Sequence, residues 1–104
     1  MIHELKIRKQ FADAIVENRK TFEVRINDRG YNAGDLVRFT VTDEVTGKKV
    51  DHPINKRTYE ITYALSGYGI RDGFVVFGIA YVIPIDQMAD CLGFLDFIKK
   101  GGVK

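Results

Sequence analysis

A lysine, a glutamate and an arginine lie close together in the run NRKTFEVR, at positions 20, 23 and 25. Arg25 presents a rigid fork of donors, Lys20 a mobile point charge, and Glu23 an acceptor for either cation or for a base amine. Phosphate groups and nucleobase edges are ligands of this kind. The simpler alternative is an ion pair between Glu23 and Arg25 on an exposed strand face, which contributes about 0 to 1 kcal/mol.

The elements around this run should hold the three side chains in place. Residues 9–18 have apolar side chains at helical spacing, which predicts a short amphipathic helix. Residues 21–26 alternate, which predicts a half-buried strand with Glu23 and Arg25 about 6.6 Å apart on its polar face. We therefore expect Lys20, Glu23 and Arg25 to face one accessible cleft. The apolar face should share the core with other strands, and the expected core residues are Phe22, Val24, Ile26, Val37, Phe39, Tyr63 and Phe77.

The rest of the chain is rich in short strands. Strands are predicted over residues 3–7, 36–42, 58–65 and 74–83, and Gly78 marks a bulge in the last one. A curled sheet or small barrel hides edges that a flat sheet of this size would expose. The predicted class is therefore α+β and strand-rich, a small barrel or a curled sheet with one early helix.

A second helix is predicted over residues 86–100, so residues 85–104 form a C-terminal helical extension of a single domain spanning 1–104. It would carry an apolar stripe widened by two aromatic rings. We expect this stripe to dock within the chain, and a homodimer contact is the alternative. The stripe consists of Met88, Cys91, Leu92, Phe94, Leu95, Phe97 and Ile98.

Composition narrows the possible functions. The 104 residues carry a formal net charge of +2, without the dense basic stripe of a duplex-binding protein. The single cysteine, Cys91, predicts a buried thiol in a reducing compartment. No signal peptide or apolar run of about 20 residues is apparent, so we expect a cytoplasmic protein with no membrane partner. His3 and His52 lack spaced partners, and we expect no metal and no cofactor.

A glycine-rich loop is the second candidate for ligand contact. The run GYGIRDG at residues 67–73 places Tyr68 and Arg71 between two predicted strands, where they could stack on a base and contact phosphate. The run lacks the lysine and hydroxyl residue of a P-loop and does not precede a helix. Binding of a nucleoside triphosphate is therefore not expected.

The pattern K-x-x-E-x-R, after a helix and at the start of a strand, resembles the signature of ASCH domains in the PUA-like superfamily. Together with HELKI at 3–7, NDR at 27–29, GD at 34–35 and GYGIRDGFVV at 67–76, it is similar to a small ASCH-related family of unknown function in phages and bacteria. The resemblance implies a PUA-like open barrel with Lys20, Glu23 and Arg25 on the floor of a cleft. It also implies recognition of RNA or modified nucleosides.

One ASCH branch hydrolyses N4-acetylcytidine with a lysine, a threonine three residues later and a distant glutamate. Here Glu23 occupies the position of that threonine, while Thr21 is offset by two. We therefore expect an RNA- or nucleoside-binding module that uses Lys20, Glu23, Arg25, Tyr68 and Arg71. The alternatives are a small amidohydrolase, with Lys20, Thr21 and Glu23 as candidate catalytic residues, and a phage-type protein-interaction module.

Overall fold

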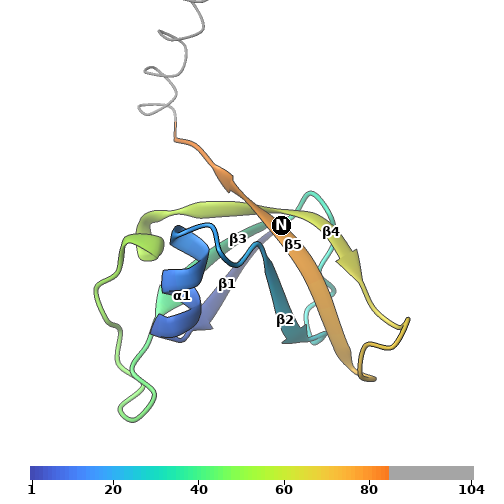
Figure 1. Cartoon of the computed structure of the whole chain (residues 1–104), viewed down its shortest axis with the longest axis horizontal. Helices are drawn as coiled ribbons and strands as arrows, with labels where there is room; N and C mark the ends of the chain where they lie inside the picture. Colours follow the sequence, from blue (N-terminus) through green and yellow to red (C-terminus); the bar gives the residue numbers. More distant parts are fainter. Residues whose placement is uncertain (85–104) are drawn as a thin grey trace, which may run out of the picture.

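The computed structural model describes residues 1–84 and shows five strands, one α-helix and one short 3-10 helix (Figure 1). The predicted helix over residues 86–100 lies outside the described residues. No helix among residues 1–84 is long and apolar enough to cross a membrane. The elements in chain order are β1 (Ile2–Ile7), α1 (Lys9–Val16), β2 (Phe22–Ile26), β3 (Leu36–Val41), η1 (Pro53–Lys56), β4 (Thr58–Leu65) and β5 (Phe74–Val82).

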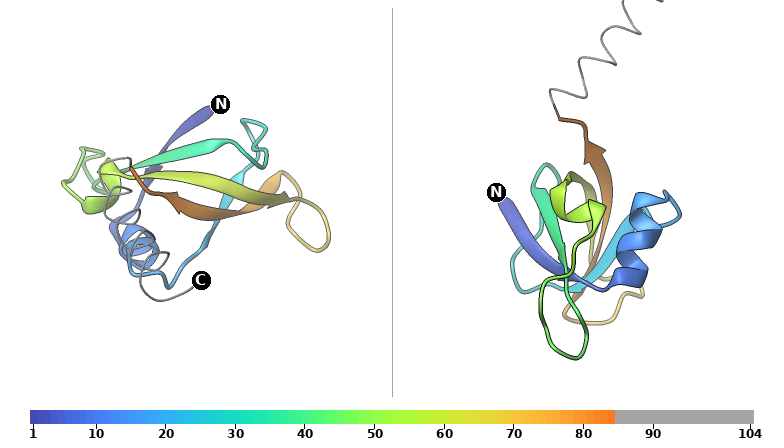
Figure 2. Two further views of the ribbon diagram at one scale, coloured as in Figure 1. Left: turned by 90° about the horizontal axis from the view of Figure 1, so that it is seen from above. Right: turned by 90° about the vertical axis from the view of Figure 1, so that its left-hand side faces the viewer.

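The five strands form one curled, mixed sheet with the spatial order β1-β3-β4-β5-β2. Strands β1 and β3 are parallel, and the other neighbours are antiparallel. Strands β1 and β2 follow one another in the chain but occupy opposite edges of the sheet. The connecting helix α1 therefore crosses the open side of the curl, as the two further views in Figure 2 show. The predicted α+β class is confirmed, and the curled five-stranded sheet with one helix forms a half-barrel that is compatible with an open barrel.

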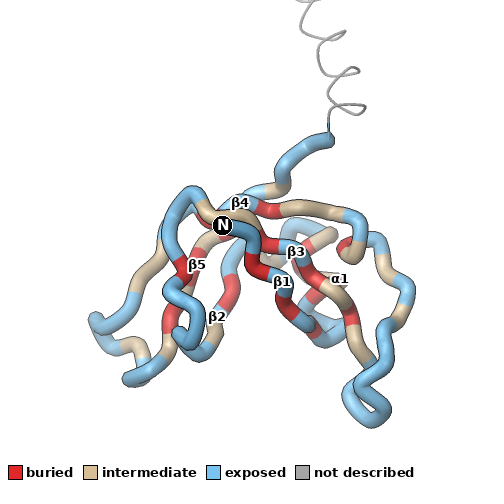
Figure 3. Tube along the Cα trace, turned by 180° about the vertical axis from the view of Figure 1, so that it is seen from behind, coloured by how far each residue is buried: buried red, intermediate tan, exposed pale blue. Residues whose placement is uncertain are grey.

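The core lies between the concave side of the sheet and the helix. Alternate strand residues point into it, which gives the repeating buried positions along each strand in Figure 3. Ala12 and Ile15 of α1 join the same cluster. The buried apolar strand residues are Leu5, Ile7, Val37, Phe39, Val41, Tyr59, Ile61, Val75, Phe77 and Ile79. Three of the predicted core residues, Val37, Phe39 and Phe77, are among them.

The predicted face of β2 is wrong. Phe22, Val24 and Ile26 point away from the core and are 45%, 52% and 62% exposed, whereas Glu23 is buried. Alternation predicts that two faces differ, but the environment of the strand decides which face is inside. Strand β2 is an edge strand, and the concave side at this edge holds ionic and backbone partners for Glu23 and Arg25.

The prediction that Tyr63 lies in the core is also wrong, for a different reason. Ile61 pairs with Ile79, but Tyr63 pairs with Gly78, so Thr62 is an extra residue in β4. Such a bulge reverses the facing of every residue after it. Tyr63 consequently lies on the convex face and is 67% exposed. The bulge is therefore in β4, opposite Gly78, and not in β5 where it was predicted. An added Cβ at Gly78 would lie 2.6 Å from Thr62 Oγ1.

Candidate functional site

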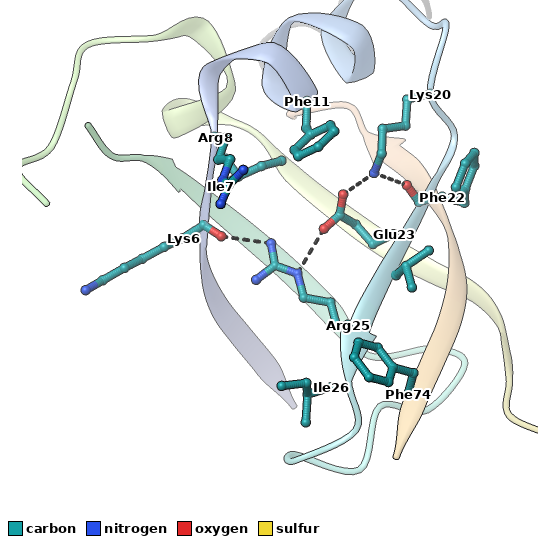
Figure 4. A pocket seen from close by; sticks show the side chains of 11 residues that line it. Lys6, Ile7, Arg8, Phe11, Lys20, Phe22, Glu23, Arg25, Ile26 and Phe74 are labelled. Carbon is teal, nitrogen blue, oxygen red and sulfur yellow. Dashed lines mark hydrogen bonds and ion pairs between the residues drawn. The ribbon is translucent and has the colours of Figure 1, made fainter. Parts of the chain in front are cut away.

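A cavity of about 600 Å³ opens between strand β1, the start of helix α1 and strand β2 (Figure 4). It occupies the gap between the two edges of the curled sheet. Its walls combine cationic side chains with aromatic and aliphatic ones. The lining residues are Lys6, Ile7, Arg8, Phe11, Lys20, Phe22, Glu23, Val24, Arg25, Ile26 and Phe74.

Glu23 is the anionic centre of this cavity. Its side chain is 6% exposed, and its two carboxylate oxygens contact different cations. Oε1 accepts a hydrogen bond from Lys20 Nζ, and Oε2 accepts one of 2.9 Å from Arg25 Nε. Lys20 Nζ also donates to the carbonyl oxygen of Phe22 at 2.5 Å. The structure thus brings the three predicted residues together, but around a buried carboxylate rather than on an exposed strand face.

Arginine side chains connect the two sheet edges. Arg25 Nη2 donates to the backbone oxygen of Lys6 on β1 at 2.8 Å. Arg29, in the loop after β2, donates from Nη1 to the backbone oxygen of Glu4 at 3.0 Å. Carbonyl groups at an open sheet edge need partners, and these guanidinium groups supply them where no strand pairs. The floor of the cavity is consequently tied to β1 as well as to β2.

Two phenyl rings flank the lysine. Lys20 Nζ lies 5.0 Å from the ring centroid of Phe22 and 5.6 Å from that of Phe11. Both separations are within cation–π range. Phe11 lies in the amphipathic helix predicted over residues 9–18, and its ring borders the cavity. The cation is therefore held between a carboxylate and aromatic faces.

The charge of the lining is unbalanced. Arg8, Lys20 and Arg25 contribute three positive charges and Glu23 one negative charge, which leaves a formal net charge of +2. Lys6 faces the cavity with its backbone oxygen, and its ammonium group points away from it (Figure 4). Arg8 lies 3.5 Å from Glu44, but both of these side chains are mostly exposed, so water weakens that pair. The cavity is suited to an anionic ligand.

The two predicted loop residues occupy different positions. Tyr68 is 92% exposed, has a left-handed φ of 54°, and does not line the cavity. Arg71 lies over the ring of Phe74, with 5.5 Å between the guanidinium carbon and the ring centroid. Arg71 thus contacts one lining residue, Phe74, but neither Arg71 nor Tyr68 lines the cavity itself.

Thr21 lies outside the cavity. Its backbone oxygen accepts a hydrogen bond of 3.0 Å from the N–H of Ile79. The residue lines a separate hollow of about 260 Å³ near Tyr59 and Tyr81. The structure therefore does not bring Thr21 to the carboxylate of Glu23, although Lys20 borders both hollows.

Both histidines form carboxylate contacts elsewhere. His3 Nε2 lies 2.9 Å from Asp35 Oδ2, and His52 Nε2 lies 2.7 Å from Asp13 Oδ1. The contact with His3 is the main reason that the pKa of Asp35 is below its usual value. The pKa of Asp13 is lowered first by its hydrogen bond with Lys9 and then by His52. Within residues 1–84 no cluster of side chains is suited to hold a metal ion.

Comparison with known proteins identifies a family for this chain. Residues 2–79 match the model of a family described as a domain of unknown function, DUF3850. The chain belongs to the DUF3850 family. All the lining residues of the cavity fall within the matched range.

Two similar proteins extend the comparison. An uncharacterized 12.9 kDa protein from the GpA 3′ region of Escherichia phage P2 is 36% identical over 59 residues, which are 55% of this chain and 54% of the phage protein. The alignment thus spans about half of each protein. The crystal structure of the hypothetical protein PH0355 superposes with a TM-score of 0.54 at 15% identity, covering 79% of this chain and 100% of that one. This second likeness shows that the DUF3850 chain shares the fold of PH0355.

Sequence reasoning missed the other eight lining residues, including Lys6, Phe11 and Phe74. Lys6 lies in the strand predicted over residues 3–7, and Phe74 begins the one predicted over residues 74–83. The approach of β1 to β2 depends on the curl of the whole DUF3850 sheet, which no local pattern encodes. The apolar pattern of residues 9–18 indicates that Phe11 faces the sheet, but not that its ring borders a cavity.

Proposed function

We propose that this protein binds RNA or a modified nucleoside in the cavity between β1 and β2, within a PUA-like open barrel. The observation that carries the proposal is the buried carboxylate of Glu23, which holds Lys20 and Arg25 in a cavity with a net charge of +2 and aromatic walls. A phosphate group can accept charge-assisted hydrogen bonds from the cations, and a nucleobase can stack on the aromatic rings. The volume of about 600 Å³ is in the usual range for small-ligand sites.

The cations are the proposed ligand contacts. Arg25 uses two of its five N–H donors in the contacts described above, and Lys20 uses two of its three. Each cation can therefore donate to a phosphate oxygen or a base carbonyl while it remains bonded to Glu23. The faces of Phe11, Phe22 and Phe74 offer stacking surfaces for the base.

Glu23 is proposed to act as a positioning residue. Both of its oxygens are engaged by cations and its side chain is 6% exposed, which favours steering of Arg25 over direct acceptance from a base amine. Arg71 would contribute at the rim through Phe74, and Tyr68 would contact parts of a longer ligand outside the cavity. Because its ligands are intracellular molecules, the proposal includes a cytoplasmic location.

The experiment is to extract and identify whatever nucleic-acid component co-purifies with the protein. The full chain, Arg25→Ala and Arg38→Ala would be purified in parallel, and the extracts digested to nucleosides and analysed by mass spectrometry. Arg38 is an exposed arginine on β3, away from the cavity, and serves as the matched control. We expect RNA-derived or modified nucleosides with the native protein and the control but a loss of them with Arg25→Ala. Equal recovery from all three proteins would contradict the proposal.

A further inference from the structure

Strand β2 has one free edge, the side that pairs with no other strand, and this edge borders the cavity. On its other side β2 pairs with β5, where the N–H of Ile79 donates to the backbone oxygen of Thr21 at 3.0 Å. In an antiparallel pair, alternate residues of a strand bond to the same neighbour, so the odd-numbered residues of β2 bond to β5. The backbone groups of Phe22, Val24 and Ile26 therefore point to the free edge.

Val24 differs from its two neighbours on this edge. Lys20 Nζ donates to the carbonyl oxygen of Phe22 at 2.5 Å, and the N–H of Asp28 donates to that of Ile26 at 2.9 Å. Within residues 1–84, no group donates to the carbonyl oxygen of Val24 or accepts from its N–H. Val24 thus presents one donor and one acceptor next to each other.

These two groups lie at the wall of the cavity, because Val24 is one of its lining residues. Both carboxylate oxygens of Glu23 are already bonded to cations. The carbonyl of Val24 is therefore better placed than Glu23 to accept from an N–H or amino group of a ligand. Each of the four RNA bases carries a donor and an acceptor side by side on its pairing edge, and proteins read this edge in unpaired bases.

We propose that the backbone N–H and C=O of Val24 bind the pairing edge of an unpaired nucleobase, an inference that rests on the nucleic-acid binding proposed above. The ligand is then single-stranded RNA, or a nucleoside, whose pairing edge is free. Bases in a duplex and bases methylated on that edge are excluded. Modifications elsewhere on the base are tolerated.

The nearby cation suits the same ligand. Lys20 Nζ is bonded to the carbonyl of Phe22, which lies two residues, or about 6.6 Å along the strand, from Val24. One nucleotide spans a separation of this size. A base bound to Val24 can therefore place its own phosphate group near the ammonium group of Lys20.

A peptide strand is the other ligand that a free sheet edge can take. Such a strand forms hydrogen bonds with successive alternate residues of the edge. Here the carbonyls of Phe22 and Ile26, on both sides of Val24, already have partners. The new ladder would be limited to one complete residue, which favours a small planar group over an extended chain.

A proline substitution tests the backbone donor directly. Val24→Pro removes the N–H, and proline is tolerated in edge strands where that group has no strand partner. The matched control is Ile2→Pro, an exposed residue of β1 that does not line the cavity. Its N–H also points away from the neighbouring strand, because the odd-numbered residues of β1 bond to β3. Val24→Ala changes the side chain but keeps the backbone groups.

Binding of a short single-stranded RNA of mixed sequence would be measured by fluorescence anisotropy for the full chain and the three variants. We expect Val24→Pro to bind about 3- to 10-fold more weakly, the loss of one hydrogen bond, and Ile2→Pro to bind as the native chain does. Val24→Ala should weaken binding less than Val24→Pro. Unfolding in urea would show that each variant is folded.

Chemical probing of the RNA bound to the native chain gives a second test, which decides the matter if Val24→Pro does not fold. Dimethyl sulfate methylates adenine and cytosine on the pairing edge and guanine at N7, away from that edge. A water-soluble carbodiimide modifies uracil and guanine on the pairing edge. We expect the protein to protect pairing edges from these reagents and to leave guanine N7 reactive.

The outcomes separate this inference from the proposed function. RNA that binds without protection of any pairing edge would overturn the role of Val24 and leave the proposed function standing. A folded Val24→Pro variant that binds as tightly as Ile2→Pro would do the same. A native chain that binds no RNA would overturn both proposals and make a peptide strand the better candidate for the free edge.

Discussion

Arg25 on β2 donates a hydrogen bond of 2.8 Å to the backbone oxygen of Lys6 on β1, so one side chain joins the two edges of the curled sheet. The same guanidinium binds Glu23 and lines the cavity. A residue proposed to contact the ligand therefore also helps to close the barrel. Stability and binding measurements on the same variants are needed to separate the two roles.

Removing Arg25 should destabilise the fold. Arg25→Ala leaves the Lys6 carbonyl without this partner and Glu23 with one cation instead of two. Hydrogen bonds that involve a charged group contribute about 1.5 to 3 kcal/mol, and we expect a loss in that range. The measurement is the free energy of unfolding in urea. Arg38→Ala, at an exposed site on β3, should change it by less than about 0.5 kcal/mol, and equal losses in the two variants would argue against the bridging role.

Glu23→Gln should lower the free energy of unfolding by more than its small change in side-chain shape suggests. The substitution keeps the volume but removes the negative charge between Lys20 and Arg25. Breaking a buried ion pair from one side costs about 3 to 5 kcal/mol, and we expect about 3 kcal/mol because both cations retain some contact with water. Thermal and urea unfolding at neutral pH measure the effect. A variant as stable as the native chain would show that the carboxylate does not hold the cations together.

Because the apolar face of β2 points outward, Phe77→Ala and Phe22→Ala should lower the stability of the fold by different amounts. Phe77→Ala removes a fully buried ring and should cost about 3 to 5 kcal/mol. Phe22 is 45% exposed, so Phe22→Ala should cost about 1 to 2 kcal/mol, not the full amount that the alternation on β2 would suggest. Paired urea titrations test the order of the two effects. Equal costs would place Phe22 in the core and contradict the observed face.

The contact of Asp35 with His3 predicts a dependence of stability on acid pH. That contact and the N–H of Asn32 favour the ionised form of Asp35, and the pKa of this carboxyl is below its usual value in the folded protein. The resulting stabilisation is present above the unfolded-state pKa, about 3.9, and is lost as pH falls through the lower folded-state pKa. We expect Asp35→Asn to flatten the fall in unfolding free energy below about pH 4. Urea midpoints from pH 2 to 6 check this, and parallel curves for the two proteins would refute it.

Local pattern predicted most elements because each depends on neighbouring residues. The bounds of β4 agree with the prediction, and the helix and the other strands differ by one or two residues at their ends. The grouping of Lys20, Glu23 and Arg25 was also predictable, since strand parity puts Glu23 and Arg25 on one side. These features need no knowledge of distant contacts.

The predictions that were wrong concern features that depend on pairing between distant parts of the chain. Whether Glu23 or Phe22 faces inward is decided by the approach of β1, which is set by the curl of five strands. The outward position of Tyr63 depends on the bulge opposite Gly78, and a one-residue slip reverses a face without changing the sequence pattern. The parallel pairing of β1 with β3 likewise brings together residues more than thirty positions apart.

Equilibrium binding of a short single-stranded RNA tests the central claim most directly. Fluorescence anisotropy would compare the native chain with Arg25→Ala, Thr21→Ala and Arg38→Ala, after each variant is shown to be folded under the assay conditions. We expect Arg25→Ala to weaken binding by about 10- to 150-fold, which corresponds to a charge-assisted contact of roughly 1.5 to 3 kcal/mol, and the other two to bind nearly as the native chain does. Binding that is unchanged by Arg25→Ala would contradict the account, as would turnover of N4-acetylcytidine that disappears in both Lys20→Ala and Thr21→Ala.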